Sequence, residues 1–148
     1  MQKLETALET DTTLPINQIS TFTLSYLGDA WYELWCRQMV LSQMQKPEFV
    51  HERVTHIVRC QAQAKVVKAI APLLNHEEQL VFRRGKNRKT LTCPKNASVK
   101  DYRAATGFEC LVGYWYLTQK TERFAALMQS EKVQTLIKKK LFPETGEK

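Results

Sequence analysis

The sequence predicts an all-α protein, and this prediction rests on three observations. Glycine is scarce, with five in 148 residues. The Asn-Gly and Asp-Gly pairs that favour tight β-hairpins are absent. Apolar residues recur three or four positions apart along most of the chain, whereas no alternation of apolar and polar residues persists. We expect one domain over residues 1–148, with its core at about 18–141 and flexible ends at 1–15 and 142–148.

The first long helix is expected over residues 18–43, after Pro15. Large or apolar side chains occupy most of its helical projection, namely Phe22, Leu24, Leu27, Trp31, Leu34, Trp35, Cys36 and Val40. A helix that is apolar on nearly all sides lies inside a protein rather than on its surface. We therefore expect this helix to be central.

The next helical pattern begins at Pro47, which suits the first turn of a helix, and Glu48 is a favourable first-turn acid. It continues to Asn75, with a break near residues 58–60. The remaining expected elements are a helix over 77–85, a loop over 86–97, a helix over 98–119 and a last amphipathic helix over 121–141. Ser98 and Asp101 have the spacing of a capping box at the start of the helix expected over 98–119.

The composition argues against several classes of protein. The 43% hydrophobic content is that of a globular domain, and no apolar run reaches the length needed to span a membrane. Acids stand near the N-terminus where a secretory signal would need basic residues, so we expect a cytoplasmic protein without a membrane partner. The four cysteines lack C-x-x-C spacing, so a structural zinc site is not expected.

The basic residues concentrate in one segment. The net charge is +7, and the segment from Arg83 to Lys100 alone holds seven basic residues and no acidic one. Such a segment attracts polyanions by electrostatic steering and by release of counterions from phosphates. An ordinary solvated loop is the alternative interpretation.

Two carboxylates stand in apolar surroundings. Asp29 lies on the expected central helix, where we expect it to be at least partly buried, and Glu109 is flanked by Ala105, Thr106 and Gly113. The small neighbours of Glu109 would let another helix approach, and the two acids would then converge. Two carboxylates beside a phosphate-binding segment suit Mg²⁺. The alternative is that each acid pairs with a basic residue such as Arg37 or Arg103.

Three stretches resemble a known family. "YLGDAWYELWCR" resembles the signature helix of ribonuclease III family nucleases, and "TGFECLVGYWYL" resembles their second, carboxylate-bearing helix. "RRGKNRKTLTCPKNASVKDYRAATGFE", together with Tyr26, resembles the Mini-ribonuclease III subfamily. The resemblance covers Leu24 to Leu117, and its elements occur in the order and spacing of the family.

The resemblance implies a homodimeric helical domain of the ribonuclease III endonuclease type, which cleaves double-stranded RNA with Mg²⁺. Asp29 falls on the catalytic, metal-binding aspartate, and Glu109 on the metal-binding glutamate, which we also expect to be catalytic. Ser25 and Thr106 stand where the full-length enzymes have further acids, and Phe22 replaces another. The implied substrate is the stem formed by the ends of precursor 23S ribosomal RNA, and a ribosomal protein is a further candidate partner.

The chain ends soon after a catalytic domain would, so we expect no separate double-stranded-RNA-binding domain. Affinity for RNA would then come from the catalytic dimer. The candidate RNA-binding residues are Arg83, Arg84, Lys86, Asn87, Arg88, Lys89, Lys95, Asn96 and Lys100. The alternatives are a catalytically inert RNA-binding module of the same fold and a helical protein-interaction domain.

Overall fold

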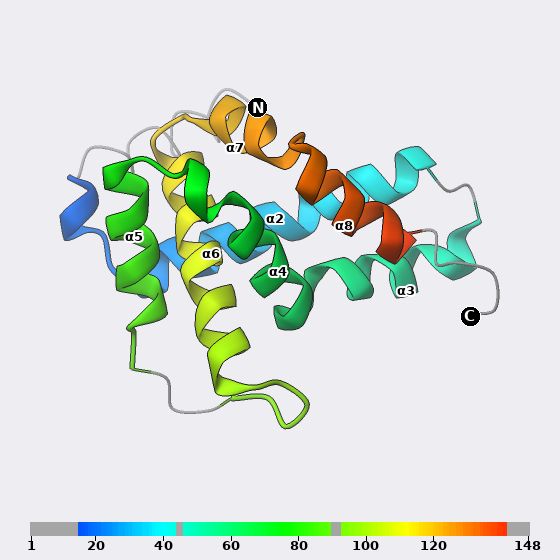
Figure 1. Ribbon diagram of the computed structural model, residues 1–148, viewed down its shortest axis with the longest axis horizontal. Helices are drawn as coiled ribbons and strands as arrows, with labels where there is room; N and C mark the ends of the chain where they lie inside the picture. The colour runs from blue at the N-terminus through cyan, green and yellow to red at the C-terminus, as the bar shows by residue number, and fades with distance from the viewer. Residues whose placement is uncertain (1–14, 44–45, 90–92, 142–148) are drawn as a thin grey trace, which may run out of the picture.

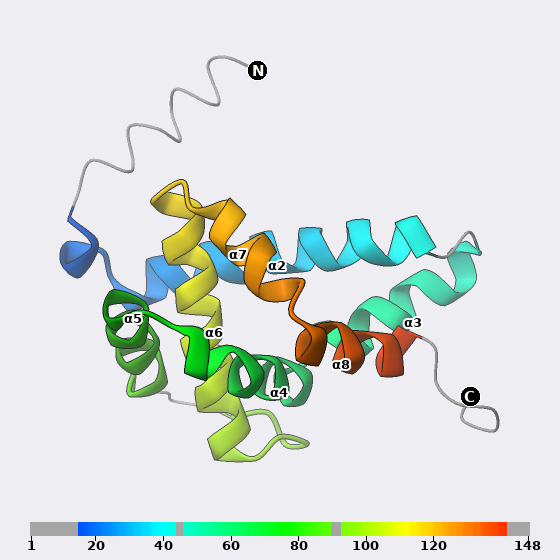
Figure 2. The same cartoon turned by 45° about the horizontal axis from the view of Figure 1, so that its top comes forward.

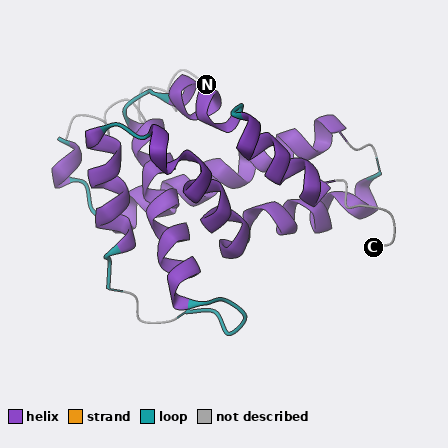
Figure 3. Ribbon diagram, viewed as in Figure 1, coloured by secondary structure: helices purple, strands orange, loops and turns teal. Residues whose placement is uncertain are grey.

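The computed structural model describes residues 15–43, 46–89 and 93–141, and every regular element within them is helical (Figures 1 and 3). The all-α prediction is confirmed. The elements are the 3₁₀ turn η1 (Ile16–Gln18), α2 (Thr21–Gln43), α3 (Pro47–Val58), α4 (Cys60–Ile70), the 3₁₀ turn η2 (Ala71–Leu73), α5 (His76–Lys86), α6 (Val99–Leu117), α7 (Thr121–Met128) and α8 (Glu131–Leu141). In these ranges no helix has the length and apolar character that crossing a membrane requires.

Helix α6 is the centre of the fold. It runs across α2 and also packs on α4 and α5, as Figures 1 and 2 show. Its large side chains are almost completely buried, Phe108 and Leu111 at 0% exposure and Trp115 at 1%. Burial of this kind supplies most of the driving force for folding.

Two glycines allow α2 and α6 to cross in backbone contact. A Cβ atom on Gly28 of α2 would collide with the carbonyl oxygen of Glu109 and lie 2.7 Å from the backbone nitrogen of Gly113. A Cβ atom on Gly113 would in turn collide with the carbonyl oxygen of Leu24. Gly113 therefore allows a neighbouring helix to approach closely, as expected, and that helix is α2.

Helix α5 packs on another side of α6 by a similar contact. A Cβ atom on Gly85 would lie 2.7 Å from the Sγ atom of Cys110 and 2.9 Å from the Cα atom of Gly107. This contact fixes the end of α5, from which the basic segment continues.

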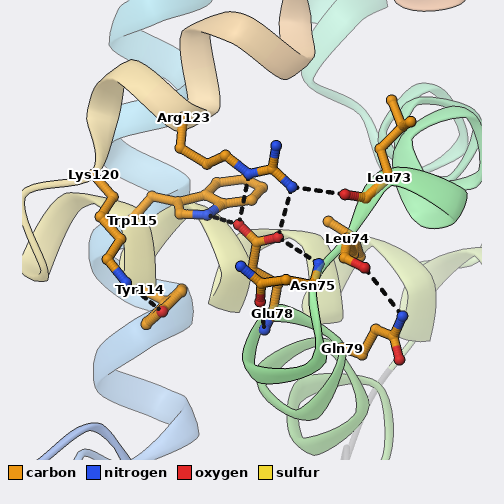
Figure 4. Close-up of polar contacts among 9 residues, drawn as sticks. All are labelled: Leu73, Leu74, Asn75, Glu78, Gln79, Tyr114, Trp115, Lys120 and Arg123. Carbon is orange, nitrogen blue, oxygen red and sulfur yellow. Dashed lines mark hydrogen bonds and ion pairs between the residues drawn. The ribbon is translucent and has the colours of Figure 1, made fainter.

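The start of α5 is held by a buried carboxylate. Glu78 is 1% exposed and accepts hydrogen bonds from Trp115 Nε1 at 2.7 Å and from the Arg123 guanidinium at 3.0 Å (Figure 4). Glu78 and Asn75 also form a reciprocal capping box. Burial raises the pKa of Glu78, but these hydrogen bonds outweigh it, and the net shift is downward. The cluster joins α5 to α6 and α7.

The structure differs from the expected elements in two places. The first α-helix begins at Thr21 instead of residue 18, because the Ser20 hydroxyl accepts a hydrogen bond from the Thr23 amide and caps it there. The single helix expected over 121–141 is wrong: it is interrupted between α7 and α8, and α8 turns to pack against α3 and α4. The expected break near 58–60 is confirmed, with Arg59 in an extended conformation. The flexible ends that we expected lie outside the described residues, apart from Pro15.

We predict that Gly28→Ala destabilises the protein by about 3 kcal/mol or more, because the added methyl group forces two helix backbones apart. Chemical denaturation monitored by circular dichroism measures the change. Ser42→Thr is the control, since it adds one methyl group at an exposed position of the same helix. Equal stability of the two variants would contradict the close crossing.

Candidate active site

The crossing of α2 and α6 brings Asp29 and Glu109 together. Asp29 follows Gly28, and Gly28 packs directly on the backbone of Glu109. The two acids are 80 positions apart in the sequence, yet they lie close enough for the negative charge of Asp29 to raise the pKa of Glu109. The convergence suggested by the small residues of α6 is therefore present.

The two acids differ in environment. Glu109 is mostly buried, and its pKa is raised to about 8, chiefly by burial and then by the charge of Asp29, while Arg88 lowers it. The pKa of Asp29 is also raised, by partial desolvation and by the neighbouring Glu33. In the absence of a cation, the site therefore disfavours two negative charges at once.

The surroundings of these acids differ from expectation in two respects. Asp29 is partly desolvated, as expected, but it is still an exposed residue, because it lies on the side of α2 that carries Phe22 and Tyr26, which are 56% and 69% exposed. The ion-pair alternative also fails: within the described ranges the salt bridges are Arg37–Glu33, His56–Glu52 and Arg123–Glu78, and none includes Asp29 or Glu109. Asp29 is thus open to solvent, and neither acid forms a salt bridge with another of the described residues.

This donor set fits Mg²⁺. The cation takes oxygen ligands and commonly uses one or two carboxylates, with water and substrate phosphate completing its shell. Asp29 and Glu109 supply two carboxylates whose mutual repulsion a divalent cation would offset. In the described part of the chain no cluster of three or more acidic, His or Cys side chains is placed to hold a metal ion.

Ser25 and Thr106, which stand where the larger enzymes are expected to have acids, use their hydroxyl groups within the fold. Thr106 donates to the carbonyl oxygen of Tyr102 at 3.0 Å. Ser25 donates to the carbonyl oxygen of Phe22 at 3.2 Å and accepts a hydrogen bond from Arg88 at 3.1 Å. Neither adds a charge to the site.

Most of the candidate RNA-binding side chains lie on the surface. The exposed ones are Arg83, Lys86, Asn87, Lys89, Lys95, Asn96 and Lys100. Arg84 and Arg88 are partly buried. Residues 90–92 of the same segment lie outside the described residues. The exposed group offers cationic and amide donors to a polyanion.

Arg84 differs from its neighbours because its guanidinium is engaged within the fold. It donates to the carbonyl oxygens of Ile16 at 3.2 Å and Ile19 at 2.8 Å, and so fixes the chain that leads into α2. The sequence predicts that Arg84 binds RNA like the other basic residues of its segment, because charge alone does not reveal a contact with a backbone carbonyl 65 residues away.

The position of Arg88 beside the carboxylates was not predicted. The small polar residue Ser25, which accepts its hydrogen bond, was the only sign of it in the sequence.

The raised pKa of Glu109 predicts a pH-dependent stability. An acid whose folded pKa lies above its usual 4.5 stabilises the fold while protonated, and this stability is lost as the pH rises towards about 8. In EDTA, Glu109→Gln should therefore have the Tm of the unmutated protein at pH 5 and a higher Tm at pH 9. Thermal unfolding at both pH values measures this. Glu122→Gln, which replaces an exposed acid on α7, is the control. A Tm difference between Glu109→Gln and the unmutated protein that is the same at pH 5 and pH 9 would contradict the prediction.

Comparison with known proteins agrees with this geometry. The Ribonuclease III domain family matches residues 23–120. The Mini-ribonuclease 3 of Enterococcus faecalis is 43% identical over 114 residues, which cover 75% of this chain and 86% of that protein. The Mini-ribonuclease 3 of Clostridium tetani is 39% identical and covers 77% of each. A crystal structure of a Fusobacterium nucleatum protein superposes with a TM-score of 0.71 at 29% identity, over 83% of this chain and 95% of that one. The chain therefore belongs to the ribonuclease III family, and it is an endoribonuclease.

Proposed function

We propose that this protein is an Mg²⁺-dependent endoribonuclease that hydrolyses double-stranded RNA. The observation that carries the proposal is the pair formed by Asp29 and Glu109, two neighbouring carboxylates that form no salt bridge within the described residues and of which Asp29 is exposed. An exposed basic segment follows α5, which packs on the same helix α6. A cation site next to a polyanion-binding surface suits phosphodiester hydrolysis.

Asp29 and Glu109 would hold the cation. When bound, Mg²⁺ stabilises negative charge on phosphoryl oxygens and lowers the pKa of the attacking water. Glu109 is the more buried of the two acids, whereas Asp29 is exposed and accessible to a bound duplex. In the reaction, the water oxygen forms a bond to phosphorus as the bond to the leaving ribose oxygen breaks, and that oxygen takes up a proton.

The exposed basic and amide side chains would bind the duplex. A-form RNA presents phosphates and 2′-hydroxyl groups across a wide minor groove, and proteins recognise it largely by shape. Lys86, Lys89, Lys95 and Lys100 offer point charges to phosphates, and Asn87 and Asn96 add neutral donors. Contacts of this kind weaken steeply as the salt concentration rises.

Cleavage of both strands would need two sites, and we propose a homodimer with one site in each subunit. The exposed face of α2 supports this, because Phe22, Tyr26, Leu34 and Leu41 are each more than half exposed, at 54–69%. Large exposed apolar side chains on one helix are typical of an interaction surface.

From the family resemblance we propose the stem of precursor 23S ribosomal RNA as the substrate in the cytoplasm, with a ribosomal protein as a candidate auxiliary partner.

The proposal predicts that Asp29→Asn cleaves an end-labelled RNA duplex in Mg²⁺ only at a small residual rate, because one of the two cation ligands is lost. Folding, measured by circular dichroism, and duplex affinity, measured by filter binding, should persist. Asp101→Asn is the matched control, since Asp101 lies outside the carboxylate pair and its backbone amide, which donates to the capping hydroxyl of Ser98, is unchanged by the substitution. Normal cleavage by Asp29→Asn would overturn the proposal.

The same assay separates the alternatives. Binding of the duplex by the unmutated protein without product at any Mg²⁺ concentration would indicate an inert RNA-binding module. Absence of salt-dependent affinity for RNA would indicate a protein-interaction domain. Preference for the precursor ribosomal stem over an unrelated duplex of equal length tests the proposed substrate.

A further inference from the structure

Arg88 lies beside the carboxylate pair. It follows the C-terminal end of α5, and its positive charge acts on both Glu109 and Cys110 of α6. It is partly buried, whereas Lys86 and Lys89 on either side of it are exposed. Arg88 is therefore the basic residue of its segment that reaches the site itself.

Two contacts with α2 fix the guanidinium. One of its terminal nitrogens donates to Ser25 Oγ at 3.1 Å, and its central carbon lies over the Phe22 ring, 5.7 Å from the ring centroid. Phe22 in turn stacks on Tyr26, with the ring centroids 5.3 Å apart. Contacts with an aromatic face and with one hydrogen-bond acceptor hold the planar group in one orientation before any substrate binds.

The fixed guanidinium forms no salt bridge with any residue that the structure describes, although Glu109 is near enough to be affected by its charge. The salt bridges there involve other arginines, and Ser25 Oγ is a neutral acceptor. A guanidinium has five N–H donors, and this contact uses one of them. Cationic donors held at the edge of a carboxylate pair are placed for an anion that must also reach that pair.

We propose that Arg88 is a catalytic residue whose guanidinium contacts a non-bridging oxygen of the scissile phosphate and stabilises the negative charge that develops there during hydrolysis. This proposal rests on the proposed function. It assigns Arg88 a role distinct from that of the exposed basic side chains. The exposed basic side chains bind the duplex as mobile point charges, whereas the guanidinium of Arg88 acts on the reacting phosphate as a fixed set of hydrogen-bond donors.

The test is single-turnover cleavage of an RNA duplex at saturating protein. For Arg88→Ala we expect the rate constant of cleavage to fall about 100-fold, the usual cost of losing one fixed donor to a developing oxyanion. Added guanidinium ion should restore part of the rate. Lys132→Ala, which removes an exposed basic residue of α8 outside the site, is the control, and its rate constant and its Kd for RNA should match those of the unmutated protein.

A phosphorothioate duplex gives the decisive measurement. Sulfur in place of the oxygen that Arg88 contacts should slow the unmutated enzyme, and this slowing should become much smaller in Arg88→Ala, whereas the effect of sulfur at the other non-bridging oxygen should be the same in both proteins. An effect of sulfur that is the same in both proteins at each of the two oxygens would overturn the proposal, as would an Arg88→Ala variant altered only in Kd. An unmutated protein that does not cleave any duplex would instead refute the proposed function itself, so the two failures are distinguishable.

Discussion

The close crossing of α2 and α6 is the constraint on which the site depends. Gly28 and Gly113 leave out the side chains that would hold the two backbones apart, and the carbonyl oxygens of Glu109 and Leu24 occupy the space. Asp29 stands next to one of these glycines, so its position relative to Glu109 is fixed by backbone contact rather than by flexible side chains. Sites built on rigid elements in this way keep their geometry with little adjustment.

The same crossing has an electrostatic cost. It places a mostly buried carboxylate beside a second one, and the pKa of Glu109 rises to about 8 as a result. A fold selected for stability alone would pair such a group, as it does Glu78 with Arg123 and Trp115. The contrast between Glu78 and the mostly buried Glu109 supports the proposal that Glu109 is held for a cation and substrate, whereas Glu78 stabilises the fold.

Much of this arrangement follows from the sequence, for reasons that individual residues show. The capping residue Ser98 and the helix-starting Pro47 act locally, so the positions of their helices were predictable. The exposure of Asp29 was not predictable, because a helical projection counts every large apolar residue as buried. Tyr26, on the same side of α2, is in fact exposed. The backbone contacts of Arg84 depend on tertiary structure in the same way.

The central claim is that Asp29 and Glu109 act as one cation-binding unit in the hydrolysis of RNA. A double-mutant cycle on the single-turnover rate constant, in Mg²⁺ with a saturating amount of protein, tests it most directly. Asp29→Asn, Glu109→Gln and the double variant should all lose activity to a similar extent, because the first substitution already disables the unit. Losses that simply multiply in the double variant would show two independent residues and contradict the account.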